Sequence, residues 1–151
     1  MVSDYLKRPV RDQMGYLREL ALTGVYSDWE TLSQYAGLLR VVAAETDLNG
    51  TGQPVFTRIA GDLWDLAGYE SDELIGRNPT VLQCEATNLD EARRLMPQVR
   101  ESGAGEVRII NQRKTGELYG CRIVAVRVPR HRDRPERLIA FLRECPMEEC
   151  P

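Results

Sequence analysis

Three segments in the final third of the chain have the composition of β-strands, and they constrain the fold more than any other feature. Their sequences are GEVRIINQR, ELYGCRIVAVRV and ERLIAFLR, at residues 105–113, 117–128 and 136–143. All three are rich in β-branched and large apolar residues, and turn-forming residues separate them. Because Lys114-Thr115-Gly116 is a tight turn, the first two segments should pair as antiparallel neighbours. We therefore expect a three-stranded antiparallel meander.

Two further strands are predicted upstream, at residues 38–46 and 54–59, joined by a turn-rich, glycine-containing loop. Between this pair and the meander, residues 60–101 are predicted to be helical in short pieces. The order of elements predicts an α+β fold, with a five-stranded antiparallel sheet and short helices packed on one side.

The last of these helical pieces is predicted at residues 89–100, with Thr87 or Asn88 as its cap. Pro97 lies inside it. Proline lacks an N–H group and its ring clashes with the preceding turn, so we expect Pro97 to kink or shorten this helix.

Residues 1–38 are predicted to form an N-terminal helical extension. One helix is expected over about residues 12–22, and the capping box Ser27-Asp28-Trp29-Glu30 begins a second that ends near Gly37. Such a segment is too small to bury its apolar face alone, so it must pack on the sheet, on a second copy or on a partner. The residues of this apolar stripe are Tyr16, Leu17, Leu20, Trp29, Leu32 and Tyr35.

Composition excludes several classes of function. The chain of 151 residues has 20 Lys and Arg against 23 Asp and Glu, which argues against a nucleic-acid-binding protein. No apolar run approaches the ~18 residues of a membrane span, and the N-terminus lacks the apolar core of a signal peptide, so we expect a cytoplasmic protein without membrane insertion. Four dispersed Cys and the single His131 support neither a disulfide framework nor a metal site or catalytic triad.

Two motifs carry a resemblance to a known family. Residues 66–83 read LAGYESDELIGRNPTVLQ, and residues 109–119 read IINQRKTGELY. They resemble the PAS domain family, and more narrowly its LOV subfamily of flavin photoreceptors, whose patterns are roughly L-T-G-Y-x-x-E-E-x-x-G-R-N-C-R-F-L-Q and L-L-N-Y-R-K-D-G-x-x-F. The resemblance covers about residues 39–145. It implies a PAS domain there, after the extension at 1–38 and before a tail at 146–151. From its residues, ECPMEECP, we expect the end of the chain to be disordered or bound to a partner.

The departures from the LOV pattern concern its photochemistry. The thiol that forms the flavin adduct in LOV domains corresponds to Pro79, which has no nucleophile. Cys84 lies five residues further on and is not assumed to replace it. We therefore expect no cysteinyl-flavin photocycle.

The residues that the resemblance assigns to flavin binding are also incomplete. Thr80 and Met96 stand where the family has arginines against the phosphate. On the later strands Asn111 is retained, whereas Gly120 stands at the second Asn position and Leu142 at the Gln position. Each polar partner lost from a buried ligand costs about 1–3 kcal/mol, so we expect no cofactor, with FMN as the one to be tested. The pocket candidates are Asn78, Gln83, Asn111, Leu142, Met96 and Pro79.

Asn78 and Gln83 also have a structural interpretation, in which they cap short helices and satisfy backbone groups. The resemblance further implies a homodimer or partner surface on the N-terminal helices, where tryptophan and tyrosine are typical of interfaces. We therefore expect a non-enzymatic regulatory PAS module of bacterial signal transduction, acting through contact with a partner such as a sensor histidine kinase. The alternative is a small-molecule sensor that binds a flavin, a haem or an apolar metabolite in the PAS pocket.

Overall fold

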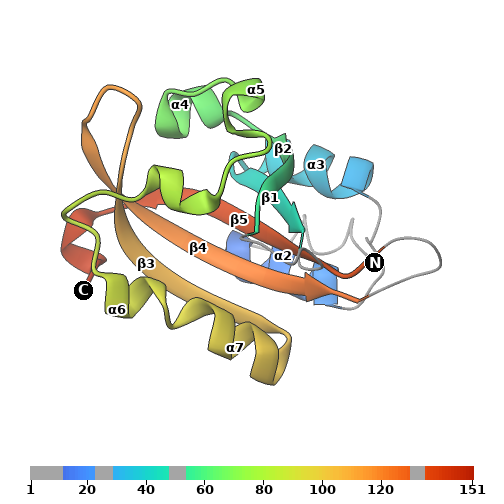
Figure 1. Cartoon of the computed structure of the whole chain (residues 1–151). Coiled ribbons are helices and arrows are strands. Elements are labelled where there is room, and N and C mark those ends of the chain that lie inside the picture. Colours follow the sequence, from blue (N-terminus) through green and yellow to red (C-terminus); the bar gives the residue numbers. More distant parts are fainter. Residues whose placement is uncertain (1–11, 23–28, 48–53, 130–134) are drawn as a thin grey trace.

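A computed structural model describes residues 12–22, 29–47, 54–129 and 135–151. Five antiparallel strands form one sheet in the order β2-β1-β5-β4-β3 (Figure 1). The strands are β1 (Val42–Asp47), β2 (Phe56–Ala60), β3 (Ala104–Gln112), β4 (Leu118–Val128) and β5 (Arg137–Cys145). The predicted α+β class, with a five-stranded antiparallel sheet, is confirmed.

Helices cover both faces of this sheet (Figure 1). The connection from β2 to β3 holds α4 (Leu63–Ala67), α5 (Ser71–Leu74), the 3-10 helix η1 (Pro79–Leu82), α6 (Leu89–Ala92) and α7 (Leu95–Ser102). The N-terminal helices are α2 (Gln13–Leu22) and α3 (Trp29–Leu38), and the 3-10 helix η2 (Met147–Glu149) follows β5.

Alternation along each strand divides the interior into two cores. On β4, Tyr119 and Cys121 point to the face covered by α4, α5 and η1, whereas Val124 and Val126 point to the face covered by α2 and α3. The front core is the first of these clusters, made of Val42, Ala44, Phe56, Leu63, Leu66, Ala67, Leu74, Leu82, Tyr119, Cys121 and Leu142. The rear core is the second, made of Met14, Leu17, Leu32, Ala36, Val41, Ala43, Val124, Val126, Val128, Ile139 and Phe141.

The rear core corrects the expectation of an interface on the N-terminal stripe. Leu17 and Leu32 are 0% exposed and Tyr16 is 6% exposed, because α2 and α3 pack on the sheet of their own chain. These three side chains are therefore not available to a partner in this fold. Trp29 and Tyr35 pack at the edge of the rear core and stay partly exposed, while the side chain of Leu20 lies outside the described residues.

Three predictions about the secondary structure are wrong, and the first two concern the bounds of elements. The first strand begins at Val42 rather than at residue 38, because α3 continues to Leu38 and the chain then turns through Arg40, whose φ is 57°. The helix expected over 89–100 is two helices, and Pro97 is the third residue of α7, where its missing N–H has no partner within the helix in any case.

The third wrong prediction concerns the C-terminal tail, which is ordered and folds back on the sheet. Strand β5 runs to Cys145, and η2 contacts β3 and β4. The loop at 48–53, Ser27 and Asp28 of the capping box and His131 lie outside the described residues. Within the described ranges, no helix is long and apolar enough to cross a membrane.

Candidate functional site

Asn78 organises the start of η1, where the LOV resemblance predicted a ligand contact. Its side-chain oxygen accepts a hydrogen bond from the backbone N–H of Thr80 at 2.9 Å, and its amide nitrogen donates to the carbonyl of Pro54 at 2.8 Å. Pro79 follows as the first residue of η1, where a proline is well tolerated. Both ends of the Asn78 amide are thus used by local structure, as the capping interpretation predicts.

Two buried polar side chains meet on the front face of β3 and β4. Asn111 lies directly opposite Tyr119 in the strand register, and both are 1% exposed. The side-chain oxygen of Asn111 and the hydroxyl of Tyr119 have no hydrogen-bond partner of good geometry among the described residues. Burial raises the pKa of Tyr119 far above its usual range, and the amide of Asn111 opposes this only partly, so the hydroxyl keeps its proton at any physiological pH.

The neighbours of this pair come from two other segments. Gln83 forms an isolated backbone bridge with Asn111, so the end of η1 lies beside β3. The guanidinium of Arg113 lies over the ring of Tyr119, 4.4 Å from its centroid. That guanidinium also donates to Glu117 at 2.6 Å, to Glu144 at 2.9 Å and to the carbonyl of Leu66.

The register of β4 corrects the expectation at Gly120. Cys121 and Tyr119 face the front core, so Gly120 between them lies on the rear side of the sheet. The residue beside Tyr119 on the pocket side is therefore Cys121, a fully buried thiol whose pKa is raised by burial. Such a thiol is unreactive. Side chains alternate between the two faces along a strand, and this alternation is the signal in the sequence that could have identified Cys121 as the residue on the pocket side.

Thr87, a candidate helix cap in the sequence, connects the segment after η1 to the sheet through hydrogen bonds of its hydroxyl. Its hydroxyl accepts from the backbone N–H of Cys84 at 2.9 Å and donates to the carbonyl of Ile110. Asn88 is the cap of α6 and accepts from the backbone of Glu91 at 3.1 Å. The Cys84 sulfur lies 3.7 Å from the Thr87 hydroxyl, in the turn beyond η1. Nothing in this arrangement makes Cys84 a substitute for the adduct-forming thiol.

The remaining pocket candidates are separated in the fold. Leu142 is 5% exposed in the front core, where it is paired with Val42 and Ile123 on the neighbouring strands. Met96 packs instead with a small cluster under α7. The structure thus brings together Gln83 and Asn111, keeps Asn78 and Pro79 at the cap of η1, and places Met96 elsewhere.

The residues present do not fit FMN. Thr80 and Met96 offer no cation to a phosphate, and the nearby guanidinium of Arg113 already serves two carboxylates and a carbonyl. Buried leucines of α4, α5, η1 and β5 pack together in the front core between these helices and the sheet. Among the described residues near η1 and β3, the orphaned atoms of Asn111 and Tyr119 are suited to a polar ligand.

A surface cavity of about 500 Å³ lies at the edge of the front core. Leu66 and Leu142 form part of its wall together with Asp62, Asp65 and Arg143. Its size is in the range of small-molecule pockets, which are about 300–1,000 Å³. Among the described residues, no group of three or more His, Cys, Asp or Glu side chains is placed to hold a metal ion.

Comparison with known proteins identifies the family. Residues 53–144 match the PAS domain model, which is more than half of the chain, and the chain therefore belongs to the PAS domain family. The fold is that of LOV domains. A LOV domain studied with a flavin analogue is similar with a TM-score of 0.69 and 14% identity, over 80% of this chain and 88% of that chain.

Two further structures show the same fold. The LOV domain of a blue-light-activated histidine kinase from Erythrobacter litoralis has a TM-score of 0.61 and 18% identity, over 70% of this chain and 95% of that chain. A fungal LOV photoreceptor has a TM-score of 0.65 and 17% identity, over 83% of this chain and 99% of that chain. The sequence matches no curated protein.

Proposed function

We propose that this chain is a non-enzymatic regulatory PAS module of the cytoplasm that acts without a cysteinyl-flavin photocycle, through contact with another signalling protein. The observation that carries the proposal is the front core. A proline begins η1 where LOV photochemistry needs a thiol, and the amide of Asn78 serves as a cap. Leucine side chains of α4, α5 and η1 pack against the sheet in the front core. With no photocycle available, protein contacts remain as the output.

A sensor histidine kinase is the first partner to test. One structure that contains the same fold is a blue-light-activated histidine kinase from Erythrobacter litoralis, of which this chain covers 36%. Its similarity, a TM-score of 0.64 at 18% identity, concerns the fold. The family relationship makes transfer of a signal to a kinase in trans a natural role for a chain of this kind.

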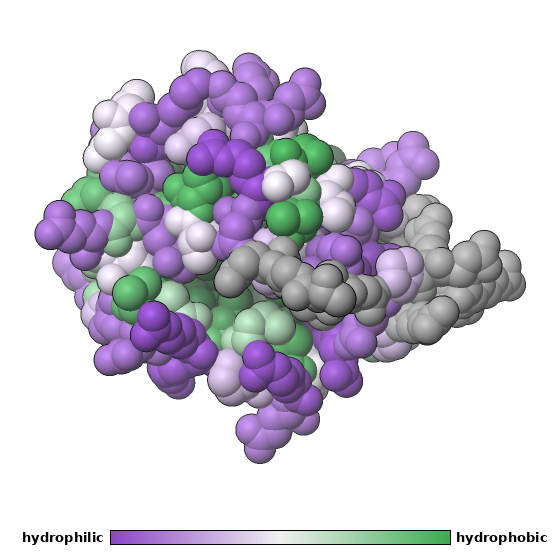
Figure 2. Space-filling model, in the orientation of Figure 1, coloured by the Kyte–Doolittle hydropathy of each residue, from purple (hydrophilic) through white to green (hydrophobic). Residues whose placement is uncertain are grey.

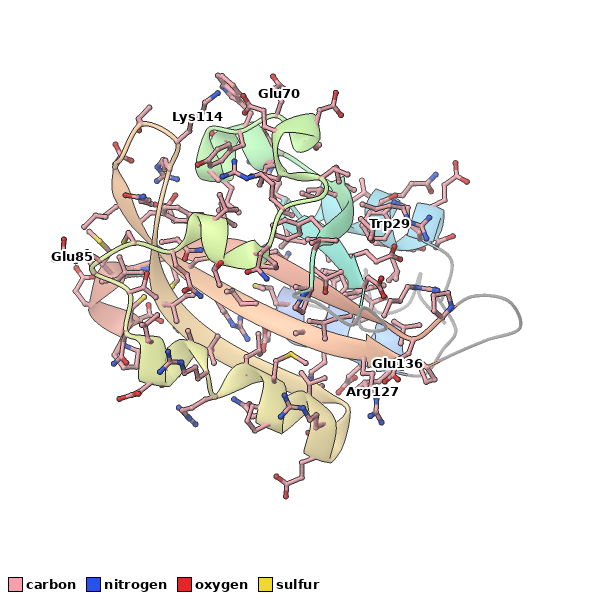
Figure 3. The ribbon with its side chains drawn as sticks, in the orientation of Figure 1. Trp29, Glu70, Glu85, Lys114, Arg127 and Glu136 are labelled. Atoms are coloured by element: carbon pink, nitrogen blue, oxygen red, sulfur yellow. The ribbon has the colours of Figure 1, made fainter. Side chains whose placement is uncertain are left out.

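The partner surface in this proposal is the edge of α3 beside the rear core, where aromatic side chains stay partly exposed. Trp29 lies there, partly exposed, with the guanidinium of Arg58 5.3 Å from its ring centroid (Figure 3). Tyr35 is partly exposed on the same helix. The face of the molecule seen in Figure 2 is mostly hydrophilic, with small separate groups of hydrophobic residues. A compact aromatic contact therefore suits the proposal better than a broad apolar interface.

A homodimer through this same edge of α3 is part of the proposal, because Leu17 and Leu32 are buried within the chain and the partly exposed aromatic residues beside them are left for a contact. A partner or ligand would act by shifting the packing of α2 and α3 on the sheet between two arrangements. The measurement for the dimer is molar mass by light scattering over a range of concentrations, with Trp29→Ala expected to reduce association.

The experiment for the kinase measures the autophosphorylation rate of a purified sensor histidine kinase with and without this chain. We expect the chain to change the rate and Trp29→Ala to weaken that effect at least ten-fold in the concentration required. Trp64→Ala is the matched control, because Trp64 is 62% exposed on α4, in the helical connection on the other face of the sheet. Equal effects of the two variants, in folded proteins, would contradict the assignment of the surface to α3.

A second candidate function rests on Asn111 and Tyr119. Their unpartnered polar atoms would suit a small ligand that both donates and accepts a hydrogen bond, bound between η1 and β3. Screening polar aromatic compounds by thermal shift tests this sensor function. A ligand that stabilises the wild type, and not Asn111→Leu, would favour it over the interaction module.

A further inference from the structure

Two cysteine thiols face each other across the C-terminal turn. Cys145 is the last residue of β5 and Cys150 follows η2, and their sulfur atoms lie 4.0 Å apart. Both residues are partly exposed. The turn between them is held by backbone hydrogen bonds of 3.0 Å from Glu149 to Pro146 and from Cys150 to Met147. The backbone thus keeps the two sulfur atoms together before any bond forms.

The turn is also fixed on the rear side of the sheet. A side chain at Gly120 would bring a Cβ atom within 2.4 Å of the Cys145 carbonyl oxygen and 3.1 Å of Pro146, so the absence of a side chain lets the C-terminal segment cross β4. Glu149 then lies 3.8 Å from the guanidinium of Arg108 on β3. The position of Cys150 is therefore set by contacts at both ends of the turn.

We propose that Cys145 and Cys150 are a redox modification site, at which a peroxide converts the two thiols into an intrachain disulfide that locks the C-terminal turn on β3 and β4. A disulfide needs its sulfur atoms at about 2.05 Å, so the two sulfur atoms approach by roughly 2 Å when the bond forms. The proposal goes beyond the proposed regulatory function and does not depend on any bound ligand.

The chemistry uses one peroxide and two thiols. The thiolate of one cysteine attacks a peroxide oxygen, the O–O bond breaks, and a sulfenic acid and one water form when the peroxide is hydrogen peroxide. The second cysteine attacks the sulfenic sulfur, the S–O bond breaks, and the oxygen leaves as a second water after taking up a proton. The two sulfur atoms together lose two electrons and the peroxide gains them.

The order of the two steps follows from the environment of the thiols. Burial and the neighbouring Cys150 raise the pKa of Cys145 to about 12, so little of it is thiolate at neutral pH. We therefore assign the attack on peroxide to Cys150 and the second attack to Cys145. Cys121 is fully buried on the front side of the sheet and takes no part.

The test treats the folded protein with hydrogen peroxide, blocks remaining thiols in denaturant and digests with trypsin. Cleavage after Arg143 releases one peptide that starts at Glu144 and contains both cysteines. We expect this peptide to lack two hydrogen atoms and to resist alkylation until it is reduced, while Cys84 and Cys121 are alkylated. Free thiols should fall from four to two, and this disulfide should exceed any other pairing at least ten-fold.

Single variants make the result specific. Cys150→Ser and Cys145→Ser should each abolish the intrachain bond, and dimedone should capture a sulfenic acid at Cys150 in the Cys145→Ser protein. Cys84→Ser is the control and should leave the bond unchanged. The proposal is overturned if both cysteines of the peptide remain alkylatable at peroxide exposures that oxidise Cys84, or if non-reducing gels show the bond only between chains.

Discussion

At the scale of single residues, the buried pair of Asn111 and Tyr119 is the most informative feature. A polar atom buried without a partner costs about 1–3 kcal/mol, so such atoms persist in folds mainly where something else satisfies them. The sequence indicates Asn111 as a pocket residue through the LOV motif. It does not indicate Tyr119 or Cys121, because their burial depends on strand register and on which helices cover the sheet.

The first prediction removes the hydroxyl of Tyr119. In Tyr119→Phe the free energy of unfolding should stay unchanged or rise by about 1 kcal/mol, because the hydroxyl has no well-aligned hydrogen bond to lose among the described residues and the ring keeps its packing. Denaturant unfolding measures this. A loss of more than about 1 kcal/mol would mean that the hydroxyl donates a hydrogen bond in the folded protein.

The second prediction compares two glycines. Gly120→Ala should destabilise the protein by about 1–3 kcal/mol, because the added Cβ meets the backbone of Cys145 and Pro146. Gly37→Ala in α3 meets no atom within 4 Å and should stabilise the helix by about 0.5–1 kcal/mol. Thermal or denaturant unfolding of both variants checks the pair. Equal changes in the free energy of unfolding for the two variants would contradict the close contact of the C-terminal turn with Gly120.

At the scale of elements, α2 is fastened to the sheet by a charged contact at its first turn. Both carboxylate oxygens of Asp12 accept hydrogen bonds from Arg122 at 3.0 Å, and Arg122 also donates to Glu106 on β3 at 2.9 Å. The hydrogen bonds from Arg122 hold the pKa of Asp12 at about 2, below its ordinary 3.8, although partial burial opposes this. Gly15 adds a backbone N–H to the same carboxylate at 3.0 Å.

The third prediction concerns the pH dependence of this contact. A lowered pKa means that the ionised Asp12 stabilises the fold, so its contribution is complete above pH ~4 and disappears as the pH falls through about 2. Because the side chain is 51% exposed, we expect Asp12→Asn to cost no more than about 1 kcal/mol at neutral pH.

The measurement is hydrogen exchange of the α2 amides in the wild type and in Asp12→Asn, from pH 7 downwards. The difference between the two proteins should shrink as the pH falls below about 4 and should be mostly lost once the pH reaches about 2. Glu101→Gln, at an exposed position of α7, serves as a control and should show no such difference. A difference that persists unchanged at pH 2 would contradict the role assigned to the ionised carboxylate.

The bounds of the strands and helices show which parts of the secondary structure could be predicted from the sequence. The β3–β4 hairpin and β5 were predicted within two residues at their ends, because alternating apolar residues and the turn at Lys114–Gly116 are local signals. The split between α6 and α7 was missed because Pro97 suggested a kink at its own position. The break falls instead at Arg93 and Arg94, which places Pro97 in a first turn.

At the scale of the whole molecule, the sheet separates two interiors with different roles. In the rear core, the N-terminal helices α2 and α3 cover one face of the sheet. The sequence left open whether these helices pack on the sheet, on a second copy or on a partner, because the answer depends on tertiary packing. The front core keeps the arrangement of a PAS domain, with Asn111 retained and with Pro79, Thr80 and Met96 at the positions where the LOV pattern has its thiol and its phosphate-binding arginines. The missing thiol at Pro79 and the capping role of Asn78 could be predicted from the sequence, whereas the contacts of Arg113 with carboxylates could not.

The most direct test of the central claim is the absorption spectrum of the freshly purified protein before and after blue illumination, with acid release of any bound chromophore. The account predicts no flavin absorption, no flavin in the extract and no change on illumination, because Thr80 and Met96 provide no phosphate contact and Pro79 no adduct. A bound flavin whose blue absorption bleaches reversibly in light would contradict it.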